Sequence, residues 1–243
     1  MTGQFAALEG GFVGTYVGVK TCASAEGLSG FVAEGTELVV WHRTLPSCFQ
    51  IWLDGVDPSN LPEARFLVRP GELPSAAETI LDECSMPAGE MRELLIDDIH
   101  ELVSRFADIT RTDFVDVRLE RISHDSCWKF HRDNVEARLL TTYRGPATEW
   151  IQPPHAEQAL REQKDYDGPI EALQRNDVAI FKGRAAASGS GIVHRSPPIA
   201  GSGRTRLLLC LNQRSEVSPT PWPLSRDGEP PLYALRALPT GPY

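Results

Sequence analysis

Apolar residues recur at two different spacings along the chain, and the change of spacing divides it into two regions. Between Met91 and Phe106 they recur every three or four residues, which predicts an amphipathic helix over about 87–107. Acidic residues line its other face, and we expect that face, including Asp98, to be solvated. Two shorter helices, over 47–53 and from an N-cap at Ser75 to residue 84, and two strands, over 36–42 and 64–68, are predicted in the same region.

After residue 110 the pattern changes to short runs of apolar and β-branched residues separated by turn residues. These runs predict strands over 114–122, 127–131, 137–143, 148–151, 178–182, 191–194 and 204–212. Many short strands without a long helix between them indicate a sandwich or a barrel. We therefore expect one domain over 1–243, with a mixed helical and strand support region (1–110), a β core (111–215) and a Pro-rich tail (216–243).

Composition and charge restrict the class of protein. Hydrophobic residues make up 41% of the chain, enough for a packed core, and the net charge of -9 argues against a nucleic-acid partner. The five cysteines form no CxxC pair, which favours reduced thiols. With neither a signal peptide nor a membrane-spanning stretch evident, we expect a cytoplasmic protein without a membrane partner. The oligomeric state stays open.

The sequence Phe130-His131-Arg132-Asp133-Asn134 contains the residues that indicate chemistry. In an extended segment His131 and Asp133 point to the same side, whereas Arg132 points away. Together with His194 they offer two imidazoles and a carboxylate, a facial set that suits Fe(II) and leaves positions for O2 and a bidentate co-substrate. Zinc, which prefers a tetrahedral site, fits less well. Taken alone, the HxD pattern is more simply a strand end followed by a turn.

The segments around His194 favour the metal interpretation. Residues 175–183 read as turn, buried strand and turn, and this resembles the segment that precedes the second metal histidine in cupins and 2-oxoglutarate oxygenases. Arg204 and Arg206 follow His194 by ten and twelve residues. In those oxygenases an arginine at this distance binds the distal carboxylate of the co-substrate, a task suited to a planar, permanently charged fork. Two arginines here leave the anchor undecided, and a surface strand edge or an ion pair with the acidic helix is the alternative for each.

Several motifs in order resemble one protein family. FHRDN, ARLLTTYRGPATEW, VAIFKG, GIVHRSPP and RLLLCLN, in a match from about Val40 to Asn212, are similar to the bacterial family DUF1826. That family carries no assigned activity, so the resemblance implies kinship alone. The HxD…H…R pattern is similar to the 2-oxoglutarate oxygenase superfamily. This implies an α+β fold with a double-stranded β-helix, a jelly-roll or cupin-like barrel, supported by the N-terminal helices.

Residues on the strands beside the predicted metal site are candidates for binding substrate. Arg138 and Thr142 share one face of the strand after Asp133, and Arg118 lies on the preceding strand. A buried arginine at these positions needs a carboxylate partner, from a ligand or from the chain.

The prediction for function is a non-haem Fe(II)-dependent oxygenase, with 2-oxoglutarate as co-substrate and a small molecule as substrate. Its metal ligands are His131, Asp133 and His194, and Arg204 or Arg206 binds 2-oxoglutarate. One alternative is an Fe(II) oxygenase or oxidase that chelates its substrate directly, without 2-oxoglutarate. Another is a non-catalytic, cupin-like protein that binds a metal or a ligand.

Overall fold

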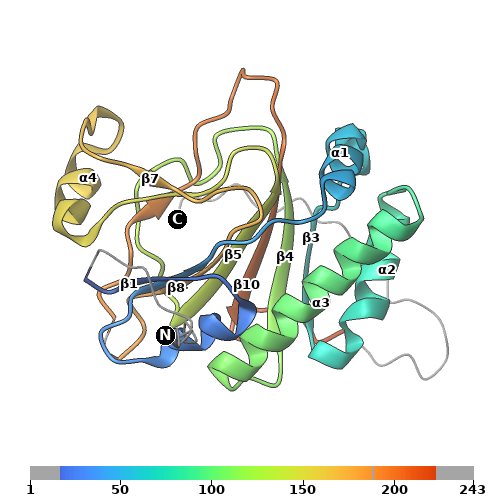
Figure 1. Ribbon diagram of the computed structural model, residues 1–243, viewed down its shortest axis with the longest axis horizontal. Helices are drawn as coiled ribbons and strands as arrows, with labels where there is room; N and C mark the ends of the chain where they lie inside the picture. Colours follow the sequence, from blue (N-terminus) through green and yellow to red (C-terminus); the bar gives the residue numbers. More distant parts are fainter. Residues whose placement is uncertain (1–16, 188, 223–243) are drawn as a thin grey trace, which may run out of the picture.

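The computed structural model describes residues 17–187 and 189–222, which form a mixed α+β structure. Strands form a seven-stranded sheet and a three-stranded sheet, here the large and the small sheet (Figure 1). The strands are β1 (Val19–Cys22), β2 (Leu38–Trp41), β3 (Ala64–Val68), β4 (Val115–Ile122), β5 (Ala137–Arg144), β6 (Glu149–Trp150), β7 (Glu171–Ala172), β8 (Val178–Lys182), β9 (His194–Arg195) and β10 (Arg206–Gln213).

The large sheet mixes strands from both ends of the chain. Its order is β1-β2-β8-β5-β10-β4-β3, and the small sheet has the order β7-β6-β9. β1 pairs with β2 in parallel, and each later pair of neighbours in the large sheet is antiparallel. β1, β2 and β3 therefore belong to the same sheet as the strands that follow residue 110.

Helices cover one face of the large sheet. The α-helices are α1 (Ser47–Gly55), α2 (Leu73–Glu83), α3 (Glu90–Thr110) and α4 (Ala156–Glu162), and the 3-10 helices are η1 (Ala25–Val32), η2 (Pro58–Asn60), η3 (Pro70–Glu72), η4 (Pro153–His155) and η5 (Gln163–Asp165). α2 and α3 pack side by side on the sheet, whereas α4 lies beside the small sheet on the other side of the molecule (Figure 1).

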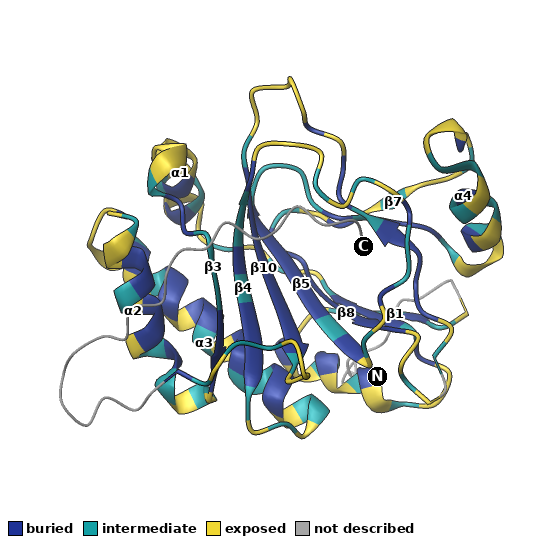
Figure 2. Cartoon of the chain, turned by 180° about the vertical axis from the view of Figure 1, so that it is seen from behind, coloured by how far each residue is buried: buried dark blue, intermediate teal, exposed yellow. Residues whose placement is uncertain are grey.

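Alternation along the strands produces two cores. On β10, Leu207, Leu209 and Leu211 pack toward the helices, while Leu208 and Cys210 pack toward the small sheet. Figure 2 shows the strands of the large sheet almost wholly buried and the helices exposed on their outer sides. We call the face of the large sheet that carries Leu208 and Cys210 the inner face; it packs against Trp150 of the small sheet.

We expected the acidic face of α3 to be solvated, but the structure buries part of it. Asp98 is buried, because it forms an ion pair with Arg43 and accepts a hydrogen bond from the hydroxyl of Tyr143 at 2.5 Å. Burial and the nearby Asp98 carboxylate raise the pKa of Tyr143 well above its ordinary value. Paired in this way, a buried carboxylate can lie between a helix and a sheet.

Three predicted elements differ from the structure. The strand expected over 191–194 shares only His194 with β9. Residues 127–131 form no strand and contribute only an isolated bridge between His131 and His194, because Cys127 has a left-handed φ of 49° that interrupts an extended chain. α2 begins at Leu73, with Pro74 in its first turn, so Ser75 lies inside the helix and is not its N-cap.

The predicted Pro-rich tail is described only to its first residues. Trp222 donates its backbone N–H to Leu67 O at 2.7 Å, and its ring packs against Phe66. Residues 223–243 lie outside the described part of the chain. Among the described helices, none combines the length and the apolar character needed to cross a bilayer.

Candidate metal site

A short backbone ladder brings the two histidines together. His131 and His194 exchange both of their backbone hydrogen bonds, N–H to O, at 3.0 Å each. β9, which begins at His194, is in turn paired with β6 through Trp150. The HxD segment is therefore docked on the free edge of the small sheet, although it lies far from β9 in the sequence.

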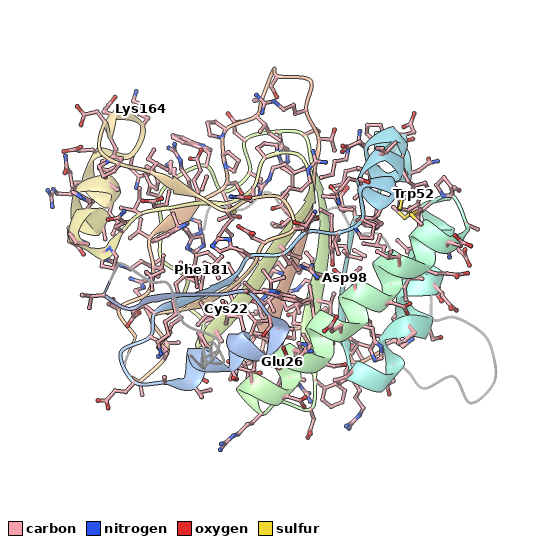
Figure 3. The ribbon with its side chains drawn as sticks, in the orientation of Figure 1. Cys22, Glu26, Trp52, Asp98, Lys164 and Phe181 are labelled. Atoms are coloured by element: carbon pink, nitrogen blue, oxygen red, sulfur yellow. The ribbon has the colours of Figure 1, made fainter. Side chains whose placement is uncertain are left out.

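The side chains of His131, Asp133 and His194 converge on one point. Each offers one ligand atom, and these atoms lie within 4.8 Å of one another. The Nε2 atom of His131 is 3.7 Å from Oδ1 of Asp133, and Nε2 of His194 is 3.3 Å from Oδ2. The ring of Phe181, labelled in Figure 3, lies 4.9 Å from the His194 ring and forms an apolar wall beside it.

Hydrogen bonds to the backbone set the tautomer of both imidazoles. Nδ1 of His131 donates to Lys129 O at 2.8 Å, and Nδ1 of His194 donates to Ile192 O at 3.0 Å. In a neutral ring the Nε2 atom is then an acceptor, and both Nε2 atoms face the Asp133 carboxylate. Three acceptors directed at one another repel unless a cation lies between them, so this donor set fits a divalent metal.

Asp133 is held through one of its carboxylate oxygens, and its other carboxylate oxygen is left for a ligand. Arg138 donates from Nη1 to Oδ1 of Asp133 at 2.5 Å, and its Nε donates to Oδ1 of Asn212 at 2.9 Å. Oδ2 of Asp133 is buried and has no hydrogen-bond partner among the residues described. A buried carboxylate oxygen of this kind is costly without a cation, which again fits a metal at this position.

Electrostatics favour the metal-binding form of Asp133 and of His131. Burial alone would raise the pKa of Asp133, but His194, Arg138 and His131 outweigh it and hold the pKa below its ordinary value. Burial, followed by the neighbouring His194, lowers the pKa of His131. At neutral pH Asp133 is thus ionised and His131 is neutral.

A close backbone approach fixes the loop that carries Asp133. Arg184 donates its N–H to Asp133 O at 2.9 Å, just after β8. A Cβ atom at Gly183 would lie 2.0 Å from Val135 O, so only glycine fits there. Arg132 points away from the metal site, as alternation predicts, and donates from Nε to Gly191 O and from Nη2 to Glu157.

The two candidate arginines after His194 lie in different environments. Arg204 is exposed and precedes β10, whereas Arg206 is the first residue of β10 and is fully buried. None of the Arg206 guanidinium nitrogens has a hydrogen-bond partner in the described ranges. Burial lowers the pKa of Arg206 to about 10, against the opposing effect of Glu120.

The residues that we predicted to bind substrate share the inner face with Arg206. Thr142 is buried there, on β5. Arg118 lies on β4 directly across from Cys210, and its buried Nε has no partner within residues 17–187 and 189–222. Arg138 contacts Asp133, so its position is beside the metal ligands.

Sequence reasoning missed two residues at this site. Asn212 holds Arg138, and Phe181 borders His194. Alternation along β10 could have indicated Asn212, which follows Cys210 by two residues. Phe181 is placed by the pairing of β8 with β5, where it lies directly across from Arg138, and the sequence carries no signal for that register.

The model of the family described as "Protein of unknown function (DUF1826)" matches residues 23–212. A search of curated proteins finds no match to the chain.

Solved structures give weak similarity. Dioxygenase for auxin oxidation 1 from Arabidopsis thaliana, in complex with 2-oxoglutarate, is 12% identical, with 72% of this chain and 76% of that chain covered and a TM-score of 0.41. HygX from Streptomyces hygroscopicus with nickel and 2-oxoglutarate is 15% identical, with 78% of this chain and 87% of that chain covered and a TM-score of 0.38. A prolyl-4-hydroxylase from Pseudomonas putida is 8% identical, with 74% of this chain and 97% of that chain covered and a TM-score of 0.33. These values are too low to assign an activity to this chain.

Proposed function

The chain belongs to the DUF1826 family, which carries no assigned activity, and we propose from its site that it is a non-haem Fe(II)-dependent oxygenase using 2-oxoglutarate to oxidise a small molecule. The observation that carries the proposal is the convergence of His131, Asp133 and His194 on one point. This donor set leaves the opposite face of a metal open, which suits iron better than a closed zinc site.

Each ligand has a defined part in holding the metal. His131 and His194 would bind through Nε2, because their Nδ1 atoms are engaged with Lys129 O and Ile192 O. Asp133 would bind through Oδ2, because Arg138 occupies Oδ1. Bound iron supplies the activation of O2, and the chain supplies orientation and a site screened from water.

Arg206 supports the use of 2-oxoglutarate. The Arg206 guanidinium is fully buried and finds no partner in the segments that the structure describes, a state that is unfavourable until a carboxylate reaches it. The distal carboxylate of 2-oxoglutarate is such a partner, and the planar fork of the arginine can bind both of its oxygens. Arg204, which is exposed, lacks this need for a partner.

For the fold, we propose that the large and small sheets are the two halves of a double-stranded β-helix. The support is that both sheets pack on one core and that the metal residues lie where the HxD segment joins the small sheet. A barrel of this kind would place the iron, Arg206 and the small-molecule substrate between the sheets, with O2 as the remaining partner.

Anaerobic spectroscopy tests the function directly. Fe(II) is added to the metal-free protein, and 2-oxoglutarate is then titrated while the visible spectrum is recorded. We expect a charge-transfer band that saturates at one 2-oxoglutarate per chain and is absent in Asp133→Ala. If Fe(II) binds but the band does not form, the alternative in which substrate chelates iron directly is favoured. If Fe(II) does not bind, the proposal fails.

A further inference from the structure

Arginines gather on the inner face of the large sheet although the chain is acidic overall. Arg118, Arg138 and Arg206 project from β4, β5 and β10, and the net charge of the chain is -9. In the pairing of β10 with β4, Arg118 lies across from Cys210 and Glu120 lies across from Leu208. In the pairing of β10 with β5, Arg138 lies across from Asn212. These groups therefore surround one region of the inner face.

The arginines differ in how they are paired. Arg138 is bound by Asp133 and Asn212, and Arg206 is left for 2-oxoglutarate in the proposed function. Within the described part of the chain, the carboxylate that Arg118 approaches is that of Glu120, with 4.0 Å between Nη1 and Oε1, which is too long for a hydrogen bond. Its Nε is buried and has no partner among the described residues, while 15% of its side chain is exposed and so remains accessible to a ligand.

The charge balance of this region leaves room for an anion. Arg65 lies across from Arg118 and is neutralised by Asp116 at 2.7 Å, and Glu149 is neutralised by Arg195 at 2.7 Å. Three guanidinium groups, those of Arg118, Arg138 and Arg206, are then left with two carboxylates, Asp133 and Glu120. Iron(II) would add two positive charges and 2-oxoglutarate two negative charges, so one positive charge stays uncompensated. In a site screened from water an uncompensated charge strongly favours a ligand of opposite charge.

We propose that Arg118 binds the carboxylate of the primary substrate, which is therefore a small organic monoanion. The inference rests on the proposed function for the roles of iron and 2-oxoglutarate. Arg118 lies across from Cys210, and the next inward-facing position along β10 is Asn212, which holds Arg138 against Asp133. A carboxylate on Arg118 thus places the rest of a small substrate beside the metal ligands. A planar carboxylate matches the guanidinium fork.

Calorimetry and spectroscopy on the same samples test the proposal. Benzoate and butyrate, with benzamide and butyramide as uncharged counterparts, are titrated into the anaerobic protein with Fe(II) and 2-oxoglutarate. The charge-transfer band is recorded in parallel with the heat of binding. We expect saturable binding of at least one carboxylate, at least tenfold weaker binding of its amide, and at least a tenfold loss of carboxylate affinity in Arg118→Gln.

Arg121→Gln is the matched control, because Arg121 lies on the same strand, β4, but donates to Pro58 O and Ser59 O on the other side. It should bind the carboxylate as the unaltered chain does. Arg118→Lys, which keeps the charge but loses the fork, should retain part of the affinity.

Each failure has a separate signature. Equal carboxylate binding by Arg118→Gln and the unaltered chain would overturn the role of Arg118, as would the absence of binding by either carboxylate. If the 2-oxoglutarate band fails to form but the carboxylate still binds through Arg118, the anion site stands and the use of 2-oxoglutarate falls.

Discussion

Replacing Arg206 with methionine should change stability and co-substrate binding in opposite directions. The side chain is fully buried at the start of β10, and its nitrogens have no partner among the residues described. Methionine has a comparable length and no charge. The metal-free protein should therefore become more stable, because an unpaired buried cation is replaced by an apolar group.

The size of the stability change follows from the lowered pKa. Burial lowers the pKa of Arg206 from the ordinary value of an arginine to about 10, and at about 1.4 kcal/mol per pH unit this corresponds to roughly 3 kcal/mol against the charged form. Because the folded-state pKa is depressed, this penalty is full below pH 10. It should shrink as the pH rises from about 10 toward the ordinary pKa of an arginine. At pH 7 we expect Arg206→Met to raise the free energy of unfolding by about 1–3 kcal/mol.

Loss of 2-oxoglutarate binding should be larger than the gain in stability. Two charge-assisted hydrogen bonds contribute about 1.5–3 kcal/mol each, so the dissociation constant should rise roughly 10²- to 10⁴-fold. Urea unfolding of the metal-free protein gives the first quantity, and the anaerobic charge-transfer titration gives the second. Arg204→Met is the control and should change neither by much. A variant at Arg206 that unfolds more easily and binds 2-oxoglutarate normally would refute the reasoning.

The remaining predictions concern the groups that hold the site in place. Arg138→Gln leaves the buried Asp133 carboxylate without its cation, so the free energy of unfolding at pH 7 should fall by about 3 kcal/mol. The pKa of Asp133 is depressed in the folded protein, so this loss should be full above about pH 4 and should diminish only as the pH falls from there through the depressed folded-state pKa. Asp133→Asn should rescue Arg138→Gln at pH 7. Urea unfolding tests both, and an equal loss in the Asp133→Asn background would contradict the reasoning. Tyr143→Phe removes a hydrogen bond to a carboxylate and should cost about 1.5–3 kcal/mol at pH 7. The raised pKa of Tyr143 means that its contribution is present below pH 10 and lost above it, so the variant should show a shallower alkaline decline in thermal unfolding; a parallel decline would argue against it. Gly183→Ala forces a Cβ atom to 2.0 Å from a backbone oxygen and should cost about 1–3 kcal/mol and weaken metal binding, as measured by unfolding and Fe(II) titration; normal values for both would remove the role given to this glycine.

The pattern of apolar and turn residues predicted those strands that depend on their own sequence and not on distant contacts. The strands expected over 64–68 and 178–182 coincide with β3 and β8, because each is a short apolar run bounded by turn residues. The spacing of His131 and Asp133, with His194 after a buried strand, was enough to name three side chains that the structure brings together.

What the sequence could not reveal depends on contacts between distant residues. Asp98 is buried because Arg43, 55 residues away, pairs with it, and no feature of the acidic helix indicates that partner. The choice between Arg204 and Arg206 depends on where β10 begins, and strand ends are poorly marked by residue type. The left-handed backbone at Cys127 has no glycine or asparagine to indicate it, so a strand was expected there.

Anaerobic equilibrium dialysis with Fe(II) tests the central claim most directly, because it measures the metal without requiring substrate or turnover. The account predicts one Fe(II) per unaltered chain. His131→Ala, Asp133→Ala and His194→Ala should each lose it while keeping a normal far-UV circular dichroism spectrum, and His155→Ala, remote on η4, should keep it. Full Fe(II) retention by any one of the first three variants would contradict the account.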